Sequence, residues 1–449
     1  MMNRMMMKKW IVVSLLLTLS FPMIANRSVE AGEEVSFKDT AKHWAKEQIE
    51  TAVQKGYVNG FPNGTFKPDQ PVTAAEFIKM IVTALGLPHE TESGAWYSTY
   101  VKAAAAAEIY QGNDDFAEGA MNDKLPRRYM AWLAVRAADD SLLTVESSGI
   151  KRDAVIDRWP MTAEDNKITR SDEDMRNYYE GFLVSEAFKR GILTGFGGND
   201  IGLDWTTTRA QAVTVIERIL TLRDGGQLPS ADKYAIGESE LAWLKTNAFI
   251  VAPQIFDDPN GVSMKGKYKL ENLSFQNSMV HTEISRILLI DLDDPKDPYR
   301  NLLPATEKLG FRDGNIGRLP TDAYAMYIEY ETLSNSNPRM YWGDLSYQTL
   351  SYVQPDPFPF NKLVQPSYLY TEEKSFENTN SNWFPENGLG KNVTVIAIPN
   401  SGYTLQPRIG EDVGKEDRGL YISIYIDPAF GDDDIRNRIF NGTTTHYDH

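Results

Sequence analysis

The chain has 449 residues, no cysteine and a formal net charge of −16 at pH 7. Its length predicts roughly two to four domains, each able to bury a hydrophobic core of its own. The absence of cysteine excludes disulfides and thiol chemistry, and an acidic chain without a basic face is not expected to bind nucleic acid.

The first 31 residues are typical of an export signal. Lys8 and Lys9 make the start basic, residues 10–25 form an apolar run, and residues 29–31 (Val-Glu-Ala) are a small-residue cleavage site. The run is short for a membrane span, which needs about 20 apolar residues, although an uncleaved anchor is the alternative. We therefore expect residues 1–31 to be a signal peptide, the mature protein to be secreted, and no membrane span to remain.

A stretch near the start of the mature chain recurs twice further along. Displacing the sequence by 135 positions aligns Asp39 with Asp174 without a gap, and displacing it by 52 aligns Trp44 with Trp96. Such internal periodicity indicates a repeated structural unit. The three expected units are residues 36–87, 95–137 and 171–222, and the middle one diverges most.

Each unit reads as a helix, a glycine-rich turn and a second helix. In the first unit Ile49 and Ala52 belong to an apolar stripe, and Gly56 stands where a helix end favours a left-handed residue. Residues 73–76 (Thr-Ala-Ala-Glu) have the spacing of a capping box, which residues 208–211 (Thr-Arg-Ala-Gln) repeat. These patterns predict an all-α region.

The glycine-rich stretch 59–77 has two alternative interpretations. A phosphate loop needs a lysine and a serine or threonine directly after its last glycine, and a calcium loop needs acids at alternate positions. The stretch has neither pattern, and Asp69 is its one aspartate. Both interpretations remain as alternatives to a repeated helical unit.

Residues 37–44 (FKDTAKHW) and 56–77 (GYVNGFPNGTFKPDQPVTAAEF) resemble the S-layer homology domain. That domain usually occurs in threes, and the resemblance covers residues 36–222. It implies a three-pronged spindle in which one helix from each repeat joins a central three-helix bundle. It also implies grooves between the prongs that bind a secondary cell-wall polymer, which is attached to peptidoglycan and commonly carries a ketal-linked pyruvate.

The family signature is Thr-Arg-Ala-Glu at the start of the second helix, and its arginine reaches the ligand. Arg209 preserves this position, Arg127 preserves it without the cap and the acid, and the first unit has Ala74 instead. A guanidinium matches a pyruvyl carboxylate with two parallel hydrogen bonds. The resemblance therefore implies that the groove with Arg209 binds the polymer, and it leaves the groove with Ala74 in doubt.

Other residues of the repeats would complete the binding sites. Glycines would let a sugar approach the backbone closely, and tryptophan faces would pack against sugar rings. The alternatives are that the aromatic rings are core, that the arginine is an ordinary solvated residue, and that the acids and the glutamine only cap helices. The candidate ligands of the wall polymer are Arg209, Arg127, Asp39, Asp174, Trp44, Trp96, Gly60, Gly195, Gln211 and Glu76.

The remaining segments differ in composition. Residues 138–170 are a polar, charged insertion between the second and third units, and residues 223–239 are a turn-rich linker. A helix is expected over 234–249. From residue 240 to 449 short strands predominate and predict a mainly β domain, a β-sandwich. The expected strands are residues 267–275, 285–292, 323–333, 392–399 and 419–427.

Three features of this C-terminal half suggest chemistry. Asp291, Asp293 and Asp297 could hold calcium, although a solvated acidic turn explains them equally well. Residues 339–352 are aromatic-rich and could be a sugar-stacking face or sandwich core. Glutamates at 329, 331, 372 and 373 could supply the two carboxylates of a glycosidase, which lie about 5–10 Å apart across a cleft, a distance that sequence alone does not set.

These observations predict a non-enzymatic protein on the surface of a bacterium with an S-layer-type envelope. Its helical half would bind the peptidoglycan-linked secondary polysaccharide, and its β-rich half would face outward to bind glycan, protein or further copies of the chain. We expect no cofactor other than the calcium considered above. The alternative is a wall-anchored enzyme that degrades polysaccharide with carboxylates of the C-terminal domain.

Overall fold

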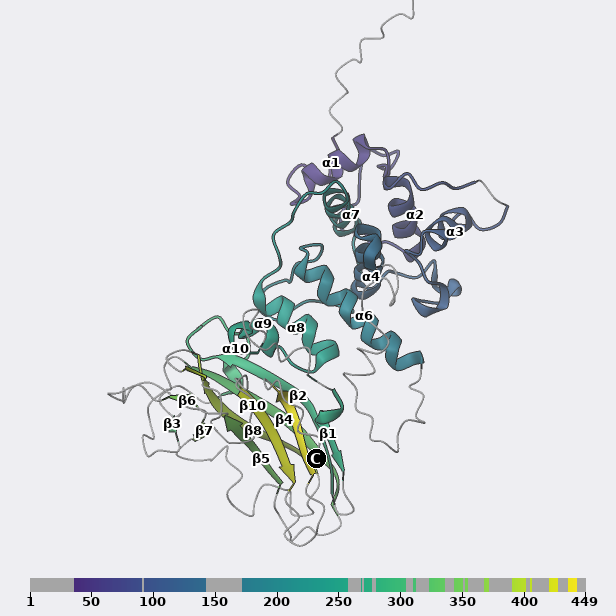
Figure 1. Cartoon of the computed structure of the whole chain (residues 1–449). Coiled ribbons are helices and arrows are strands. Elements are labelled where there is room, and N and C mark those ends of the chain that lie inside the picture. Colours follow the sequence, from purple (N-terminus) through teal and green to yellow (C-terminus); the bar gives the residue numbers. More distant parts are fainter. Residues whose placement is uncertain are drawn as a thin grey trace, which may run out of the picture.

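The computed structural model has a helical region followed by antiparallel sheets, with short helices between them (Figure 1). The predicted signal peptide and most of the predicted insertion lie outside the described residues. The structure describes residues 36–90, 93–142, 172–256, 268, 270–276, 280–303, 310–311, 323–335, 343–349, 352–353, 367–370, 390–400, 404–405, 420–426 and 435–441.

Six helices form three pairs, which we call unit 1 (residues 36–87), unit 2 (95–137) and unit 3 (172–222). The first helix of each pair packs against the second helix of another pair: α1 against α7, α3 against α2, and α6 against α4. The second helices α2, α4 and α7 also contact one another. The pairs are α1 (Lys46–Gln54) with α2 (Ala74–Ala84), α3 (Ser98–Ala106) with α4 (Arg127–Ala138), and α6 (Asp172–Lys189) with α7 (Arg209–Arg223).

A closed ring of three main-chain hydrogen bonds joins the units where their second helices begin. The amide of Val72 donates to the carbonyl of Thr207 at 2.9 Å, that of Thr207 to Leu125 at 2.8 Å, and that of Leu125 to Val72 at 2.9 Å. The first two amides of α2 donate to carbonyls of unit 2, those of α4 to unit 3, and those of α7 to unit 1. Helix amides that lack intrahelical partners are thus satisfied between units.

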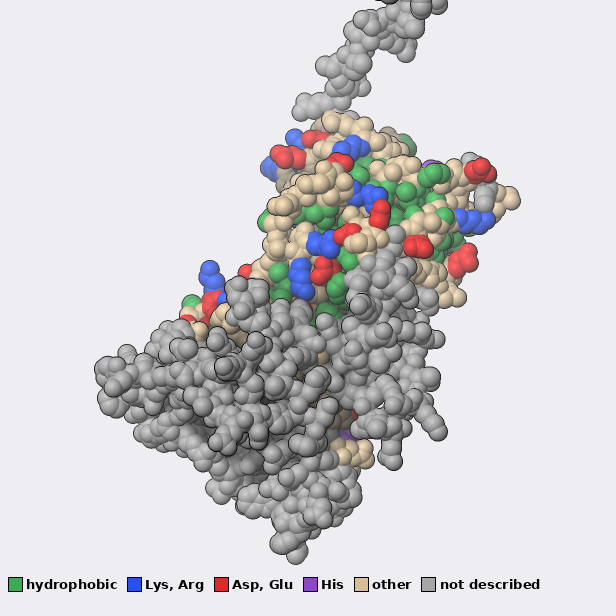
Figure 2. All heavy atoms as spheres, in the orientation of Figure 1, with side chains coloured by type: hydrophobic (Ala, Val, Ile, Leu, Met, Phe, Trp, Pro, Cys, Tyr) green, Lys and Arg blue, Asp and Glu red, His purple; other side chains and the backbone are tan. Residues whose placement is uncertain are grey.

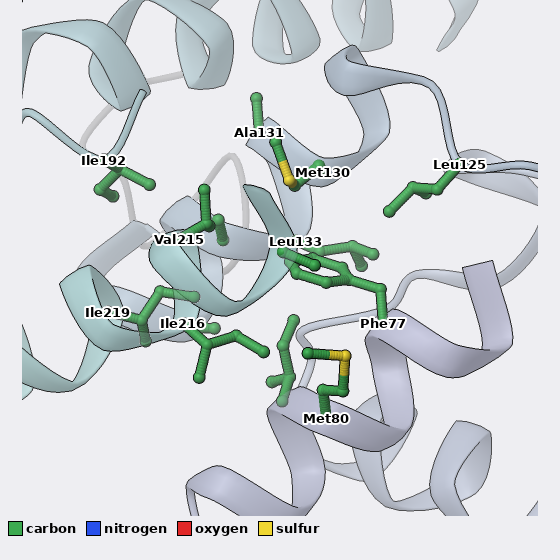
Figure 3. Close-up of a cluster of buried hydrophobic side chains, with 14 of the residues drawn as sticks. Phe77, Met80, Leu125, Met130, Ala131, Leu133, Ile192, Val215, Ile216 and Ile219 are labelled. Atoms are coloured by element: carbon green, nitrogen blue, oxygen red, sulfur yellow. The ribbon is translucent and has the colours of Figure 1, made fainter. Parts of the chain in front are cut away.

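The core of the helical region lies where α2, α4 and α7 meet. Phe77 of α2, Leu133 of α4 and Ile216 of α7 are all buried and point toward one another (Figure 3). These side chains fall on the apolar stripes that the repeat pattern predicts. Burial of each contributes roughly 1.5–3 kcal/mol, so this contact between the second helices stabilises the three units together.

Local signals predict the helix ends well. The capping box of α2 is confirmed, with Thr73 accepting from the Glu76 amide and Glu76 accepting from the Thr73 amide. Thr208 and Gln211 form the same box at α7. Gly56 has a φ of +79° just after α1, as expected for a helix C-terminus.

The single helix predicted over 234–249 is wrong, because it is two helices. The first, α8 (Lys233–Leu244), ends where Lys245 adopts a left-handed φ of 59°. Asn247 then exchanges side-chain hydrogen bonds with the backbone of Leu289, at 3.1 and 2.6 Å. This exchange diverts the chain onto the sheet before α9 (Ala248–Val251) and α10 (Pro253–Phe256). The first two turns of α8 occupy part of the predicted linker.

The C-terminal strands form a six-stranded sheet of order β1-β2-β4-β8-β7-β3, a three-stranded sheet β11-β10-β5 and the pair β6-β9. The paired strands of the described residues are all antiparallel. The strands are β1 (Ser274–Gln276), β2 (Val280–Asp291), β3 (Gly310–Phe311), β4 (Ala323–Asn335), β5 (Gly343–Thr349), β6 (Tyr352–Val353), β7 (Ser367–Tyr370), β8 (Gly390–Pro399), β9 (Thr404–Leu405), β10 (Leu420–Ile426) and β11 (Ile435–Asn441).

Both faces of the central strands are covered, which explains their nearly continuous apolar sequences. Ile287 lies in one buried cluster with Phe440 of β11 and Phe256 of α10, whereas its neighbour Leu288 lies in another cluster with Leu241 of α8. The predicted strand 267–275 is mostly wrong, because Leu270–Leu273 is a 3-10 helix that precedes the short β1.

Short 3-10 helices complete the described elements. They are η1 (Gly112–Asp114), η2 (Glu118–Ala120), η3 (Asp140–Leu142), η5 (Leu270–Leu273) and η6 (Arg300–Leu302).

No helix in the described part of the chain combines the length and the apolar character that crossing a bilayer requires.

Candidate functional site

The candidate site consists of the seams between neighbouring units. In each seam the first residue of a second helix faces a loop of the next unit. Seam 3/1 places Arg209 of unit 3 against Asn59 of unit 1, and seam 2/3 places Arg127 of unit 2 against Thr194 of unit 3. In seam 1/2 the equivalent residue is Ala74, which is buried and carries no charge. Guanidinium groups therefore stand in two seams related by the repeat.

Arg209 is held firmly in seam 3/1. Its Nε donates to the carbonyl oxygen of Phe66 and its Nη2 to that of Asn59, both at 3.0 Å. The guanidinium carbon lies 4.5 Å from the Phe66 ring centroid and 5.1 Å from that of Phe61. Burial lowers the pKa of Arg209, and the nearby Glu76 carboxylate opposes that shift. These two hydrogen bonds use two of the five N–H groups of the guanidinium, and a further acceptor could be bound by Nη1 or by the second N–H of Nη2.

Arg127 occupies the equivalent position in seam 2/3. Its Nη2 donates to the Thr194 carbonyl at 2.6 Å, and its guanidinium lies 4.8 Å from the centroid of the Phe196 ring. The Nε is buried and has no hydrogen-bond partner among the described residues. Burial and the nearby Arg218 lower the pKa of Arg127 to about 10, while Asp200 opposes them. An incoming carboxylate would therefore relieve a buried positive charge.

The predicted ligand Asp39 has a structural role within unit 1. Its two carboxylate oxygens accept from the amides of Phe66 and Lys67 at 2.9 and 2.8 Å. Burial acts to raise the pKa of Asp39, but these amides outweigh it and hold the pKa below its usual value. Asp39 therefore shapes the loop against which Arg209 packs. Its repeat partner Asp174 lies near the start of α6, and at that residue the structure describes the backbone alone.

The two predicted glycines are required by packing within the chain. A Cβ on Gly60 would come within 2.0 Å of the Phe37 ring, and a Cβ on Gly195 would come within 2.9 Å of the Ala235 Cβ of α8. The chain itself thus fills the space beside both glycines. The expectation that this space admits a sugar is not supported by these contacts.

The other predicted ligands divide into caps and exposed rings. Glu76 and Gln211 use their side-chain oxygens in the capping boxes, at 2.9 and 3.0 Å from the amides they cap. Trp44 and Trp96 are 63% and 51% exposed. The alternative that these two rings belong to the core is therefore wrong, and both remain open to solvent.

Sequence reasoning missed several residues of the seams. The carbonyl partners of the arginines and the rings of Phe66 and Trp205 were not among the candidates. The displacement of 135 positions does align Phe61 with Phe196 and Asn59 with Thr194, which is the signal that could have found them. Trp205 aligns with Gln70 of unit 1, so the comparison of the repeats does not predict an aromatic residue at that position.

The acidic loop after β2 carries the three aspartates considered as a calcium site, and its carboxylates have partners within the chain. Asp291 and Asp294 both lie 3.3 Å from the ammonium of Lys233. Asp293 accepts from the Asn400 side-chain amide at 2.9 Å, and Asp297 accepts from the Asp291 amide at 2.8 Å. The described residues contain no group of three or more histidines or acids able to hold a metal ion. The Lys233 ammonium supplies the positive charge that a cation would bring.

The glutamates considered for glycosidase chemistry are placed only in part. Glu329 forms an ion pair with Arg286 through both carboxylate oxygens, which leaves it poorly suited to proton transfer. Glu331 lies directly opposite Glu283 in the β2–β4 pairing. Residues 372–373 lie outside the described residues.

Charges of both signs are intermixed on the helical region. Figure 2 shows Lys and Arg side chains beside Asp and Glu side chains on the face in view. Long-range attraction by a single-sign surface is therefore weak on this face. Recognition of an anion would rest on the partly desolvated seam arginines.

Comparison with known proteins finds a known domain in the first helical unit. The family model of the S-layer homology domain matches residues 36–78. An amylopullulanase of Thermoanaerobacterium thermosulfurigenes is 29% identical over 41% of the chain and 9% of its own length. An S-layer protein of Bacillus thuringiensis subsp. finitimus is 33% identical over 23% of the chain and 13% of its own length. A cellulosome-anchoring protein of Acetivibrio thermocellus is 33% identical over 20% of the chain and 20% of its own length.

The protein is therefore one that carries an S-layer homology domain, and residues 36–78 form that domain. The matched segments span 9% and 16% of the lengths of the first two relatives, an amylopullulanase and an exoglucanase. Most of each relative thus has no counterpart in these alignments.

Proposed function

We propose that the protein is a cell-surface protein held non-covalently on the cell wall, and that its seams bind an anionic secondary polymer linked to peptidoglycan. The S-layer homology domain and the names of the relatives, which include an S-layer protein and a cellulosome-anchoring protein, support this assignment. The three units would act together as the three-pronged spindle of the family. The cyclic packing of α1, α3 and α6 on the second helices supports that arrangement.

The observation that carries the proposal is the matched pair of seam arginines. Arg209 and Arg127 are 9% and 6% exposed at equivalent positions, and both donate hydrogen bonds to main-chain carbonyl oxygens. Charged hydrogen bonds strengthen in such partly desolvated places. The protein and the proposed polymer are both acidic, so overall charge attraction would not drive binding. A carboxylate on a sugar, such as that of a ketal-linked pyruvate, would instead pair directly with these guanidinium groups.

The C-terminal β-rich region would face away from the wall and bind glycan, protein or further copies of the chain. We propose a non-enzymatic role that requires no cofactor. The alternative of a polysaccharide-degrading enzyme draws on relatives named for such activities, but those matches cover 9%, 16% and 9% of their lengths. Release of reducing sugar from wall polysaccharide by the purified chain would favour the enzyme instead.

The binding test uses the full chain and purified wall sacculi. The protein should sediment with intact sacculi and not with sacculi stripped of the secondary polymer. Arg209→Ala should weaken binding about 10- to 100-fold, as expected for loss of a charged hydrogen bond, and more than Arg127→Ala does. Arg209→Lys tests whether charge alone suffices, because lysine lacks the fork.

The matched control is Lys46→Ala, since Lys46 is a partly exposed cation of α1 that pairs with Glu50. It should bind as the wild type does. Thermal unfolding of each variant separates lost binding from lost folding. Equal sedimentation of the wild type with stripped and intact sacculi would refute a polymer-specific role.

A further inference from the structure

Seam 2/3 carries an exposed pair of aromatic rings that seam 3/1 lacks. Phe196 and Trp205 are 46% and 53% exposed, and their ring centroids are 4.8 Å apart. The carbonyl oxygen of Trp205 accepts the Arg127 amide at 2.9 Å, and the Arg127 guanidinium lies over Phe196. The two rings therefore adjoin the buried guanidinium.

The backbone beneath the rings is shaped to hold them. Gly202 has a φ of +55°, and a Cβ there would come within 2.8 Å of the Phe196 ring and 3.0 Å of the Trp205 ring. Only glycine adopts this conformation freely and leaves that space. Both rings thus pack against one glycine. The two side chains therefore have little conformational freedom left to lose when a ligand packs on them.

The equivalent place in seam 3/1 is built from cations. Displacement by 135 positions aligns Lys67 with Gly202 and Gln70 with Trp205. Lys67 has the same left-handed backbone, with a φ of 55°, and its ammonium lies 4.1 Å from the centroid of the Phe61 ring. The Phe61 ring therefore has two cations close to it, those of Lys67 and Arg209, whereas the Phe196 ring lies beside a second ring.

We propose that Phe196 and Trp205 form a stacking platform for one sugar ring of the wall polysaccharide, so that the two seams recognise different features of it. Seam 2/3 would bind the apolar C–H face of a pyranose, and seam 3/1 would bind a charged substituent. This inference rests on the proposed function. A polysaccharide fits because it offers both an apolar ring face and, for Arg127 beside it, an acidic or hydroxyl oxygen.

The two modes differ in their response to salt. Charge interactions are screened as ionic strength rises, to a smaller extent where they are partly buried as at Arg209, whereas burial of apolar surface is not weakened by salt. Binding through Trp205 should therefore persist at high salt, and the part of the affinity that depends on Arg209 should decline.

The experiment measures binding of the full chain to intact sacculi at low and high salt, and to sacculi whose carboxyl groups have been chemically reduced. Trp205→Ala should lower the affinity about five- to tenfold under all three conditions. Trp205→Phe should retain most of the affinity, because it keeps a ring. Gln70→Ala, at the equivalent position of unit 1, is the matched control and should bind as the wild type does.

The outcomes separate this inference from the proposed function. If the wild type distinguishes intact from stripped sacculi but Trp205→Ala binds equally well, the platform is refuted and polymer anchoring stands. If the wild type does not distinguish them, the anchoring function itself fails. If Trp205→Ala binds sacculi normally but changes the sedimentation coefficient of the free protein, the rings are a contact between copies of the chain, which also overturns the inference.

Discussion

The amide of Val72 donates a hydrogen bond to the carbonyl oxygen of Thr207, with 2.9 Å between the two atoms. These residues are equivalent positions of units 1 and 3, and two further bonds of the same kind pass through Leu125 of unit 2. In this closed ring each unit donates one hydrogen bond to a neighbouring unit and accepts one from the other. The helical units therefore depend on one another both through this ring and through the core formed by their second helices.

Val72→Pro should destabilise all three units together. Proline keeps an apolar side chain of similar size but removes the donor, which leaves a buried carbonyl without its partner and costs about 1–3 kcal/mol. Denaturant unfolding measures the loss of stability. Hydrogen exchange of the Leu125 and Thr207 amides then shows whether units 2 and 3 are destabilised together with unit 1. Val72→Ala keeps the amide and serves as the control for side-chain loss. Separate unfolding of unit 1, with the Leu125 and Thr207 amides still protected, would contradict the prediction.

Gly181→Ala should lower stability although alanine is the better helix former. Gly181 lies in α6, and a Cβ there would come within 2.2 Å of the Trp243 Cβ of α8. Overpacking of this kind costs about 1–3 kcal/mol, which exceeds the gain of about 1 kcal/mol in helix propensity. The control is Gly119→Ala, because no atom lies within 4 Å of a Cβ at that position. Thermal unfolding compares the two, and a more stable Gly181→Ala variant would contradict the close packing of α6 on α8.

Arg136→Met should destabilise unit 2 strongly. The Arg136 Nη1 donates to Asp115 at 2.9 Å and to the Ile109 carbonyl at 2.8 Å, and both charged side chains are buried. Removal of one partner leaves a buried charge alone, which costs about 3–5 kcal/mol. Adding Asp115→Asn to Arg136→Met should recover part of this loss in a double-mutant cycle. A double variant no more stable than the single one would show that the charge of Asp115 is not the cause.

Asp297 should make stability fall as pH rises from about 4 to 7. Its carboxylate is buried against the Asp291 and Tyr299 amides, and burial raises its pKa from 3.8 to about 7 despite the Asp291 amide, which acts in the opposite direction. Within this window the folded chain holds a proton that the unfolded chain has lost. The unfolding free energy therefore decreases with pH, by on the order of 4 kcal/mol from this group.

Unfolding by urea across this pH range measures the effect. Asp297→Asn cannot ionise, so its stability should lack this contribution and vary less between pH 4 and 7. Asp294→Asn is the control, because Asp294 is a loop carboxylate whose pKa lies below its usual value and does not rise into that window. An unchanged slope in Asp297→Asn would assign the pH dependence to other groups.

Local sequence patterns predicted the parts of the fold that local interactions decide. The boxes at Thr73 and Thr208 follow from spacing over four residues, and the left-handed Gly56 follows from the end of an apolar stripe. The helix expected over 234–249 shows where this reasoning stops. The helix ends at the left-handed Lys245, and Asn247 then bonds to Leu289, a residue of a distant strand that helical periodicity does not reveal.

The candidate site was predicted only in outline. The repeat and its arginines were visible in the sequence, but the functions assigned to Gly60 and Gly195 ignored the side chains packed on them. Trp205 was invisible for the opposite reason: it breaks the repeat, and its exposure and its contact with Phe196 exist only once the unit is folded.

The sequence alone determined that a small helical unit recurs, where its second helices begin, and which seams have an arginine, because these depend on residues a few positions apart. The tertiary structure decided what each arginine touches. Arg209 meets the Phe66 carbonyl 143 residues away and the Asn59 carbonyl 150 residues away. Contacts over such separations arise from the joint packing of three units, and no one unit's pattern specifies them.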